Sequence, residues 1–294
     1  MLSKIDQGVM FMFFSALISA LNGAVAKVLG DDMSALEIVF FRNLIGVFFI
    51  LVMLRHTPAK LPGGKFHLLL LRGFFGFSAM ILFFYTITVI PLGEAITLNK
   101  TSPLFVAILA FFLLNEKLSV LGILALFVGF LGVLLVTNPS GLSIGYEHFL
   151  GVLGGFLAAA AYATIKKIKH LYDARVIVLS FMGMGATVPL VLFLVSPYIQ
   201  APEALSFLFT PFSMPDTLHV WSLIALMAVI STISQWLLTK AYSHSKAGII
   251  GVVSYTNIPF AIGFGFMLGD AFPGFWALVG IGLIILGGLL VKKG

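Results

Sequence analysis

The sequence predicts an all-helical integral membrane protein with ten transmembrane helices. Of its 294 residues, 60% are hydrophobic and only 10% are charged, whereas a soluble domain is about 45–50% apolar and about 25% charged. The apolar residues also gather into ten long runs, and a helix needs about 20 apolar residues to cross a bilayer. A soluble globule requires a polar surface, so much of this chain must face lipid.

The runs are predicted to be helices because they are apolar throughout. A barrel strand would alternate apolar and polar residues. In lipid, moreover, a helix satisfies its own backbone hydrogen bonds within one segment. The predicted spans cover residues 8–29, 35–54, 68–90, 92–114, 120–137, 149–168, 176–195, 218–241, 247–268 and 272–291.

The limits of the spans have local causes. The "AVA" at 24–26 resembles a signal-peptide cleavage site, but the first run is long enough to span, and we expect it to stay in place. Pro91 separates the third and fourth spans, because the residue before a proline avoids the helical region. The longest connection, 196–217, contains four prolines. We expect it to form an irregular or interfacial loop on the outer side.

Lys and Arg residues gather on alternate connections between the spans. By the positive-inside rule, this pattern predicts a cytoplasmic (inner) membrane protein with both termini in the cytoplasm. The net charge of +6 therefore marks one membrane side and does not indicate a nucleic-acid partner. With the N-terminus inside, the inner segments hold Lys4, Arg55, Lys60, Lys65, Arg72, Lys117, Lys166, Lys167, Lys169, Arg175, Lys240, Lys246, Lys292 and Lys293. The outer connections have no Lys or Arg and hold the acidic residues Asp31, Asp32, Glu37, Glu94, Glu147, Glu203, Asp216 and Asp270.

The two halves of the chain resemble each other. The segment "GILALFVGFLGVLLV" (122–136) aligns with "ALVGIGLIILGGLLV" (277–291), and "NKTSPLF" (99–105) lies in register with "YTNIPFA" (255–261). Because each copy would have five spans, the second copy must enter the membrane from the opposite face. The sequence thus predicts two inverted repeats, 1–140 and 141–294, an architecture common among secondary transporters.

Several motifs resemble a known family. The stretch 84–136, with "SPLF" and "NEKLS", is similar to EamA-type members of the drug/metabolite transporter superfamily. So are "FFRN" at 40–43 and, more loosely, the tail 268–291. The resemblance covers essentially the whole chain and implies ten helices, inverted five-helix repeats and transport of small organic solutes by alternating access. The "PLGEA" at 91–95 is also similar to members that carry S-adenosylmethionine. Lys100 stands where many members have a small or apolar residue.

Lys100 is the principal candidate for binding substrate. It lies about eight residues into the fourth predicted span, about 5 Å from the midplane at 1.5 Å per residue. Burying its charge unpaired costs at least about 2.5–3.5 kcal/mol. One interpretation is an anchor for a substrate carboxylate or phosphate, and the other is a structural ion pair with a neighbouring helix. We favour the anchor, because ionisable residues inside a membrane are usually functional.

Pro103 and Pro259 are predicted to break the fourth and ninth spans, because proline removes a backbone donor and frees a carbonyl. Freed backbone is tolerated where it lines a cavity, although a kink that serves only packing is the alternative. Arg42 is a second deep cation, which either binds substrate or pairs with Glu37 or Glu94. Lys27 is close enough to the outer end to reach the interface. The other candidate lining residues, which alternatively join or pack helices, are Asn99, Thr101, Ser102, Asn22, Tyr85, Tyr162, Gln235, Trp236, Tyr255 and Asn257.

The charges exclude some functions. No Asp or Glu lies near a predicted midplane, and every His is in a loop or at a span end. We therefore expect an anionic or zwitterionic solute, such as an amino acid or a related metabolite, moved by facilitated diffusion or exchange. The alternative is a nucleoside-type metabolite such as S-adenosylmethionine, or a vitamin. A membrane-embedded enzyme or lipid-processing protein is a different class, but the chain has no HExxH and no GxSxG motif. We expect no enzyme activity, metal or cofactor, and the sequence does not predict the oligomeric state.

Overall fold

The computed structural model describes residues 7–59, 61–114, 120–137, 145–245 and 247–291. Over these residues the protein is all-helical, as predicted, with no strand. The helices are α1 (Gln7–Leu29), α2 (Ala35–His56), α3 (Phe66–Val89), α4 (Leu92–Asn99), α5 (Ser102–Leu114), α6 (Val120–Thr137), α7 (Tyr146–Ile168), α8 (Ala174–Val195), α9 (Leu218–His244), α10 (Ala247–Ser254), α11 (Asn257–Met267) and α12 (Phe275–Val291). Two short 3₁₀ helices, Ser196–Tyr198 and Glu203–Leu208, form part of the long loop between α8 and α9.

The helices account for the predicted spans. Among the described residues, six helices are long and apolar enough to cross a membrane: α1, α2, α3, α7, α8 and α9. The helices α6 and α12 are shorter, with 18 and 17 residues. The predicted spans 92–114 and 247–268 are each two helices, α4 with α5 and α10 with α11. The boundary between the predicted repeats, the "NEKLS" motif and the basic residues Lys4, Lys60, Lys117, Lys246, Lys292 and Lys293 lie outside the described residues.

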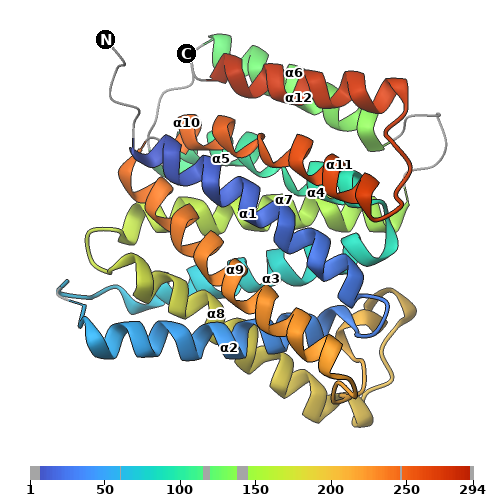
Figure 1. Ribbon diagram of the computed structural model, residues 1–294. Coiled ribbons are helices and arrows are strands. Elements are labelled where there is room, and N and C mark those ends of the chain that lie inside the picture. The colour runs from blue at the N-terminus through green and yellow to red at the C-terminus, as the bar shows by residue number, and fades with distance from the viewer. Residues whose placement is uncertain (1–6, 60, 115–119, 138–144, 246, 292–294) are drawn as a thin grey trace.

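The helices form stacked layers (Figure 1). At one edge α6 and α12 lie side by side, and at the other edge α2 packs on α8. The four half-span helices lie between α6 and α12 on one side and α1 and α7 on the other, with α4 against α11 and α5 against α10. The two breaks are therefore held inside the bundle.

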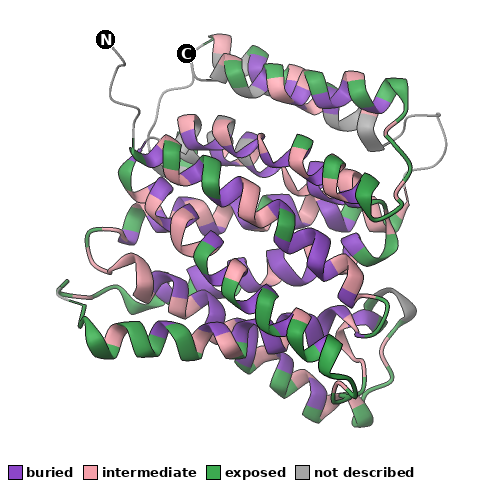
Figure 2. Cartoon of the chain, in the orientation of Figure 1, coloured by how far each residue is buried: buried purple, intermediate pink, exposed green. Residues whose placement is uncertain are grey.

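The surface of the bundle is apolar. Figure 2 shows buried residues on the helix faces that turn inward and exposed residues on the outer faces. Many of the exposed side chains are large and apolar, such as Phe48 at 64%, Phe112 at 71% and Leu194 at 66% exposure. Soluble monomers rarely expose contiguous apolar patches of more than a few hundred Å². This surface therefore belongs in contact with lipid chains.

Both broken spans are interrupted in the same way. The fourth span leaves the helix at Lys100 and Thr101, and the ninth leaves it at Tyr255 and Thr256. In each break the threonine Oγ1 donates to the carbonyl three residues earlier, Leu98 or Val253, at 2.8 Å. The same carbonyls also accept from the backbone N–H of Thr101 and Thr256, so each threonine closes the end of its helix twice.

The prolines lie after the breaks and not at them. Pro103 is the second residue of α5, and Pro259 is the third residue of α11. A first-turn proline costs no intrahelical bond, since its missing N–H would have had no helical partner. In both spans one helix ends and another starts just before the proline, so each span contains a break and not a kink within one helix.

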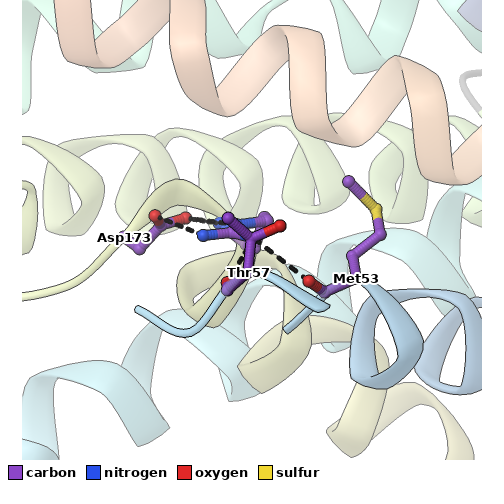
Figure 3. A network of polar contacts seen from close by, with 4 residues as sticks. Met53, Thr57 and Asp173 are labelled. Carbon is purple, nitrogen blue, oxygen red and sulfur yellow. Dashed lines mark hydrogen bonds and ion pairs between the residues drawn. The ribbon is translucent and has the colours of Figure 1, made fainter. Parts of the chain in front are cut away.

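At one end of the bundle, Arg175 joins α8 to α2. Its Nε donates to Asp173 Oδ1 and its Nη2 to Asp173 Oδ2, both at 3.0 Å. Its Nη1 donates to the carbonyl of Thr57, just after the end of α2, at 2.8 Å and to that of Met53, within α2, at 3.3 Å (Figure 3). Asp173 is also the N-cap of α8 and accepts from the Arg175 backbone.

This contact makes the stability of the protein depend on pH. The hydrogen bond from Arg175 holds the pKa of Asp173 below its usual value. A depressed carboxyl pKa stabilises the fold above the unfolded value of about 3.9 and stops doing so as pH falls through the folded value. Because the pair is partly exposed, we expect Asp173→Asn to cost less than about 1 kcal/mol at pH 7. Asn also caps helices well, so the cap survives. The loss of thermal midpoint should shrink toward pH 3, and an equal loss at both pH values would contradict the role of the charge.

At the opposite end, Lys27 at the end of α1 forms an ion pair with Asp270, which precedes α12. Asp270 also accepts a hydrogen bond from the first backbone N–H of α4, at Leu92, at 3.2 Å. The sequence predicted that Lys27 would reach the interface. The structure instead gives it a carboxylate partner that links three elements.

Candidate functional site

A polar cavity of about 90 Å³ lies in the middle of the bundle. Helices α1, α2, α3, α7, α8 and α9, the α4–α5 break and the start of α11 all contribute to its wall. The described residues that line it are Ser19, Asn22, Arg42, Arg72, Gly76, Ala79, Met80, Phe83, Phe84, Asn99, Lys100, Ala158, Ala161, Tyr162, Phe181, Gln235, Leu238 and Asn257. Three of these side chains are cationic and none is acidic. The charged side chains among the described lining residues are therefore all positive.

Lys100 reaches the cavity because the helix stops there. It is the C-cap of α4, with φ −76° and ψ 8°, and the chain turns before α5 starts at Ser102. Asn99 and Lys100 line the cavity together. Within the described residues, no ion pair involves Lys100. The structural interpretation, an ion pair with a neighbouring helix, is therefore not what this structure contains.

Arg42 on α2 is 3% exposed and packs among apolar groups. Its guanidinium carbon lies 5.5 Å from the ring centre of Phe84 and 5.8 Å from that of Phe181, and its Nη1 contacts Met80 Sδ. Its Nε is buried without a hydrogen-bond partner. The expected pair with Glu37 or Glu94 is wrong for the described residues. Cation–π contacts stabilise the charge only in part.

Glu37 and Glu94 have other partners. Glu37 Oε1 accepts from the backbone and the hydroxyl of Ser213 in the long loop, at 2.6 and 2.8 Å. Its other oxygen completes a capping box with Ser34 at the start of α2. Glu94 lies 3.9 Å from His148 Nε2 on α7. Both acids are thus held near helix ends, away from the cavity cations.

The wall formed by α1, α9 and α11 is polar and uncharged. Asn257, the first residue of α11, donates through Nδ2 to the Ala16 carbonyl at 2.6 Å. Asn22 is 6% exposed, and its Oδ1 has no partner. Gln235 lies on α9. Tyr162 also lines the cavity and stacks on Tyr242, with ring centres 4.8 Å apart.

The structure brings seven of the predicted site residues to this cavity: Asn22, Arg42, Asn99, Lys100, Tyr162, Gln235 and Asn257. Thr101 and Ser102 are buried but do not line the cavity. The Thr101 hydroxyl donates to the Leu98 carbonyl within the α4–α5 break. Tyr85 stacks on Phe207 of the long loop, at 4.2 Å. The Trp236 ring lies 4.3 Å from Lys240 Nζ. Tyr255, 2% exposed, lines an apolar crevice with Pro259 between α1, α10, α11 and α12, and its hydroxyl has no partner.

Arg72 is the functional candidate that the sequence reasoning missed. It was counted among the inner basic residues, yet it is 1% exposed and lines the cavity from the second turn of α3. Its guanidinium carbon lies 5.0 Å from the ring centre of Phe181, and its Nε has no partner. The available signal was its position, inside an apolar run and not in the preceding loop.

Metal binding finds no support among the described residues. No group of three or more His, Cys, Asp or Glu side chains is placed to hold an ion in that part of the chain. The cavity offers three cations and several amides, which suit an organic anion and repel a metal cation.

Comparison with known proteins gives the class. Residues 6–138 match the model of the EamA-like transporter family. An uncharacterized transporter of Helicobacter pylori is 32% identical over 97% of this chain and 94% of its own. The pseudopaline exporter CntI of Pseudomonas aeruginosa is 29% identical over 99% and 95%. The S-adenosylmethionine uptake transporter of Rickettsia bellii is 24% identical over 95% and 90%.

A solved crystal structure shares the fold, with a TM-score of 0.70 over 97% of this chain and 96% of that one, at 15% identity. The fold and the central cavity define a polytopic helical membrane protein, and the similar proteins that carry names are transporters. The chain belongs to the EamA-like transporter family, within the drug/metabolite transporter superfamily.

Proposed function

We propose that this protein carries an anionic or zwitterionic organic solute, such as an amino acid or a related metabolite, across the cytoplasmic (inner) membrane. It does so by alternating access, as a facilitator or an exchanger. One observation carries the proposal. The central cavity holds Lys100, Arg42 and Arg72, and no described lining residue is a carboxylate. Two buried arginines and a half-buried lysine without acids favour a ligand that brings negative charge.

The helix contacts support two inverted repeats, 1–140 and 141–294. If the first five spans correspond to the last five, α3 packing on α7 corresponds to α9 packing on α1. Likewise, α5 on α7 corresponds to α11 on α1, and α4 on α11 corresponds to α10 on α5. Each pair of corresponding contacts is present in the structure. Two such halves can rock about a central site and open it to each side in turn.

The size of the cavity supports a moving carrier. Ligand sites usually have volumes of about 300–1,000 Å³, and this cavity has about 90 Å³. A solute therefore requires the walls to separate. The broken spans and the Lys27–Asp270 pair are elements that such a movement would rearrange.

The orientation is testable because the chain contains no cysteine. With cytoplasmic termini, the loop between α8 and α9 lies outside and the turn between α7 and α8 lies inside. Met214→Cys and His170→Cys place single thiols at exposed positions in these two segments. We expect a membrane-impermeant maleimide to label residue 214 in intact cells and residue 170 only after permeabilisation. The reverse pattern would show the opposite orientation.

Counterflow tests the function. Proteoliposomes are loaded with an unlabelled amino acid or organic acid, and the labelled solute is added outside. A carrier takes up label transiently above equilibrium, and the uptake saturates. An enzyme would return the label in a changed molecule, so the recovered solute is checked for identity. Absence of counterflow for every anionic and zwitterionic solute would contradict the proposal. Transport that vanishes without a proton gradient would contradict the facilitative mechanism.

The alternative substrates are a nucleoside-type metabolite such as S-adenosylmethionine and a vitamin such as riboflavin, because relatives are named for the uptake of these two solutes. The cationic cavity argues against the first, because its sulfonium would meet three like charges. The names of the relatives also include an exporter. Counterflow operates in either direction, so the test does not depend on which one the cell uses.

A further inference from the structure

Arg72 adds a third positive charge to the cavity. The role inferred for it rests on the proposed function. The guanidinium groups of Arg42 and Arg72 contact the same ring, that of Phe181, at 5.8 and 5.0 Å. They come from different helices, α2 and α3, and both line the same cavity. In the described part of the chain, neither group has an ion-pair partner. Two like charges are thus held near each other in the protein interior.

This arrangement is costly when empty. Like charges repel more strongly in the protein interior than in water, because the effective dielectric constant there is lower. Each buried Nε of Arg42 and Arg72 also lacks an acceptor, and a buried donor without a partner is unfavourable. A folded protein retains such a pair where an anion binds between the groups. Planar guanidinium forks match a carboxylate in two parallel hydrogen bonds.

Lys100 forms a separate cationic position. It lies on the α4–α5 break, whereas the arginines lie on α2 and α3. Within the described residues, Lys100 has no ring contact of the kind that holds the arginines to Phe181. An ammonium is a point charge on a flexible stem, suited to a second anionic group whose position varies. The cavity thus offers an anion a pair of guanidinium groups at one position and a single ammonium at another.

We propose that the transported solute is an organic dianion, by which we mean a solute with at least two carboxylates, whether or not it also carries an ammonium. One carboxylate binds the Arg42–Arg72 pair, and another binds Lys100. Asn22, whose Oδ1 has no partner, and Asn257 line the same cavity from α1 and α11 and orient the uncharged middle of the molecule. A monoanion or an ordinary zwitterion would leave one cationic position uncompensated. Arg72 is therefore a specificity-determining residue, and its role is to select for the additional carboxylate.

Matched probes that differ by one carboxylate test this proposal. Purified protein in detergent is titrated with glutamate and glutamine, aspartate and asparagine, and succinate and succinamate, with the thermal midpoint as readout. Chloride and inorganic phosphate form separate arms. We expect the dianion of at least one pair to bind about 10-fold or more tightly than its monoamide, a tenfold difference being 1.4 kcal/mol. Arg72→Gln should reduce that preference to less than about 2-fold, because the fork that reads the second carboxylate is lost.

Two variants keep the test interpretable. Arg42→Gln removes the other half of the fork and should reduce the same preference, so it replaces Arg72→Gln if that protein does not fold. Arg55→Gln changes an exposed arginine in the last turn of α2, which does not line the cavity, and should leave the preference intact. Loss of preference in Arg55→Gln would mean that general charge and not the cavity selects the dianion, which overturns the proposal.

Other outcomes also overturn it. Equal binding of dianions and monoamides, or no binding of any dianion, contradicts a second carboxylate position. Stabilisation by chloride or phosphate alone would mean that inorganic counterions occupy the cationic positions. Counterflow separates this inference from the proposed function. Saturable counterflow of a monoanion without preference for its dianion overturns the dianion and leaves the carrier, whereas no counterflow of any solute overturns both.

Discussion

Replacing Lys100 by Met is expected to abolish most transport while leaving the protein folded and slightly more stable. Met keeps the length of the side chain and removes the ammonium. Truncating one partner of a buried charge pair costs about 2–5 kcal/mol of binding, so the apparent affinity for the solute should fall by about 30-fold or more. Counterflow at a fixed, low solute concentration measures the loss.

The stability change distinguishes an anchor from a structural lysine. Without ligand, Lys100 has no ion pair within the described residues, and burying an unpaired charge is unfavourable. Its removal should therefore raise the thermal midpoint of the empty protein. A structural ion pair predicts the opposite sign, because its loss would leave a carboxylate buried alone. Lys167→Met, at an exposed position of α7, is the matched control and should change neither quantity. Normal transport by Lys100→Met would eliminate the anchor.

The sequence located the helices well because lipid imposes a simple rule. Any segment that crosses the bilayer must be apolar over its whole length, so a run such as 35–54 identifies α2 without knowledge of its neighbours. The broken spans were also predictable, since Pro103 and Pro259 occur at the same depth of two similar segments. The residues at which each span breaks were harder to predict. Each break depends on Thr101 and Thr256 closing the preceding helices, and those hydrogen bonds are local details that proline alone does not fix.

The cavity was predicted in part. Polar residues near the middle of a span are predicted to line a central cavity. Successive helical residues, however, point about 100° apart, so only some of them can face it. Asn99 and Lys100 therefore reach the cavity while Thr101 turns toward the backbone of its own break. Tyr85 stacks on Phe207 of the long loop, whereas Trp236 contacts Lys240 one turn along its own helix, α9. Which face of each helix turns inward follows from packing between segments distant in the sequence.

Arg72 illustrates a different limit. Cations near the inner ends of spans usually mark the cytoplasmic side, so a single arginine in the first turns of α3 was counted as a topology signal. In the structure, Gly76 lies one turn later and lets the Arg72 guanidinium pack against α3 beside Phe181. The inward direction of that side chain is a property of the α3–α8 contact. The position of Arg72 inside an apolar run indicates its depth in the membrane, but not which neighbouring helix its side chain faces.

Substituting Gly132 by Val is expected to damage the fold, because it forces α6 and α12 apart. A Cβ at residue 132 would lie 2.5 Å from the carbonyl oxygen of Gly280 and 2.9 Å from the backbone nitrogen of Ile284. Backbone atoms cannot rotate away as a side chain can. Gly287 presses on α6 in the same manner, with its Cβ position 2.7 Å from the Ala125 carbonyl oxygen. Membrane helices associate through such close packing at small residues.

Gly282 supplies the control for this prediction. It lies on α12 too, but a Cβ there would meet nothing within 4 Å. Overpacking costs about 1–3 kcal/mol or more, so Gly132→Val should lower the thermal midpoint by roughly 5 °C or more. Gly282→Val should be neutral or slightly stabilising, since Val is the better helix former. Equal effects of the two variants would mean that helix propensity and not contact decides. If Gly132→Val instead folds normally but transports slowly, the α6–α12 contact moves during transport and is not the fixed scaffold on which the broken spans turn.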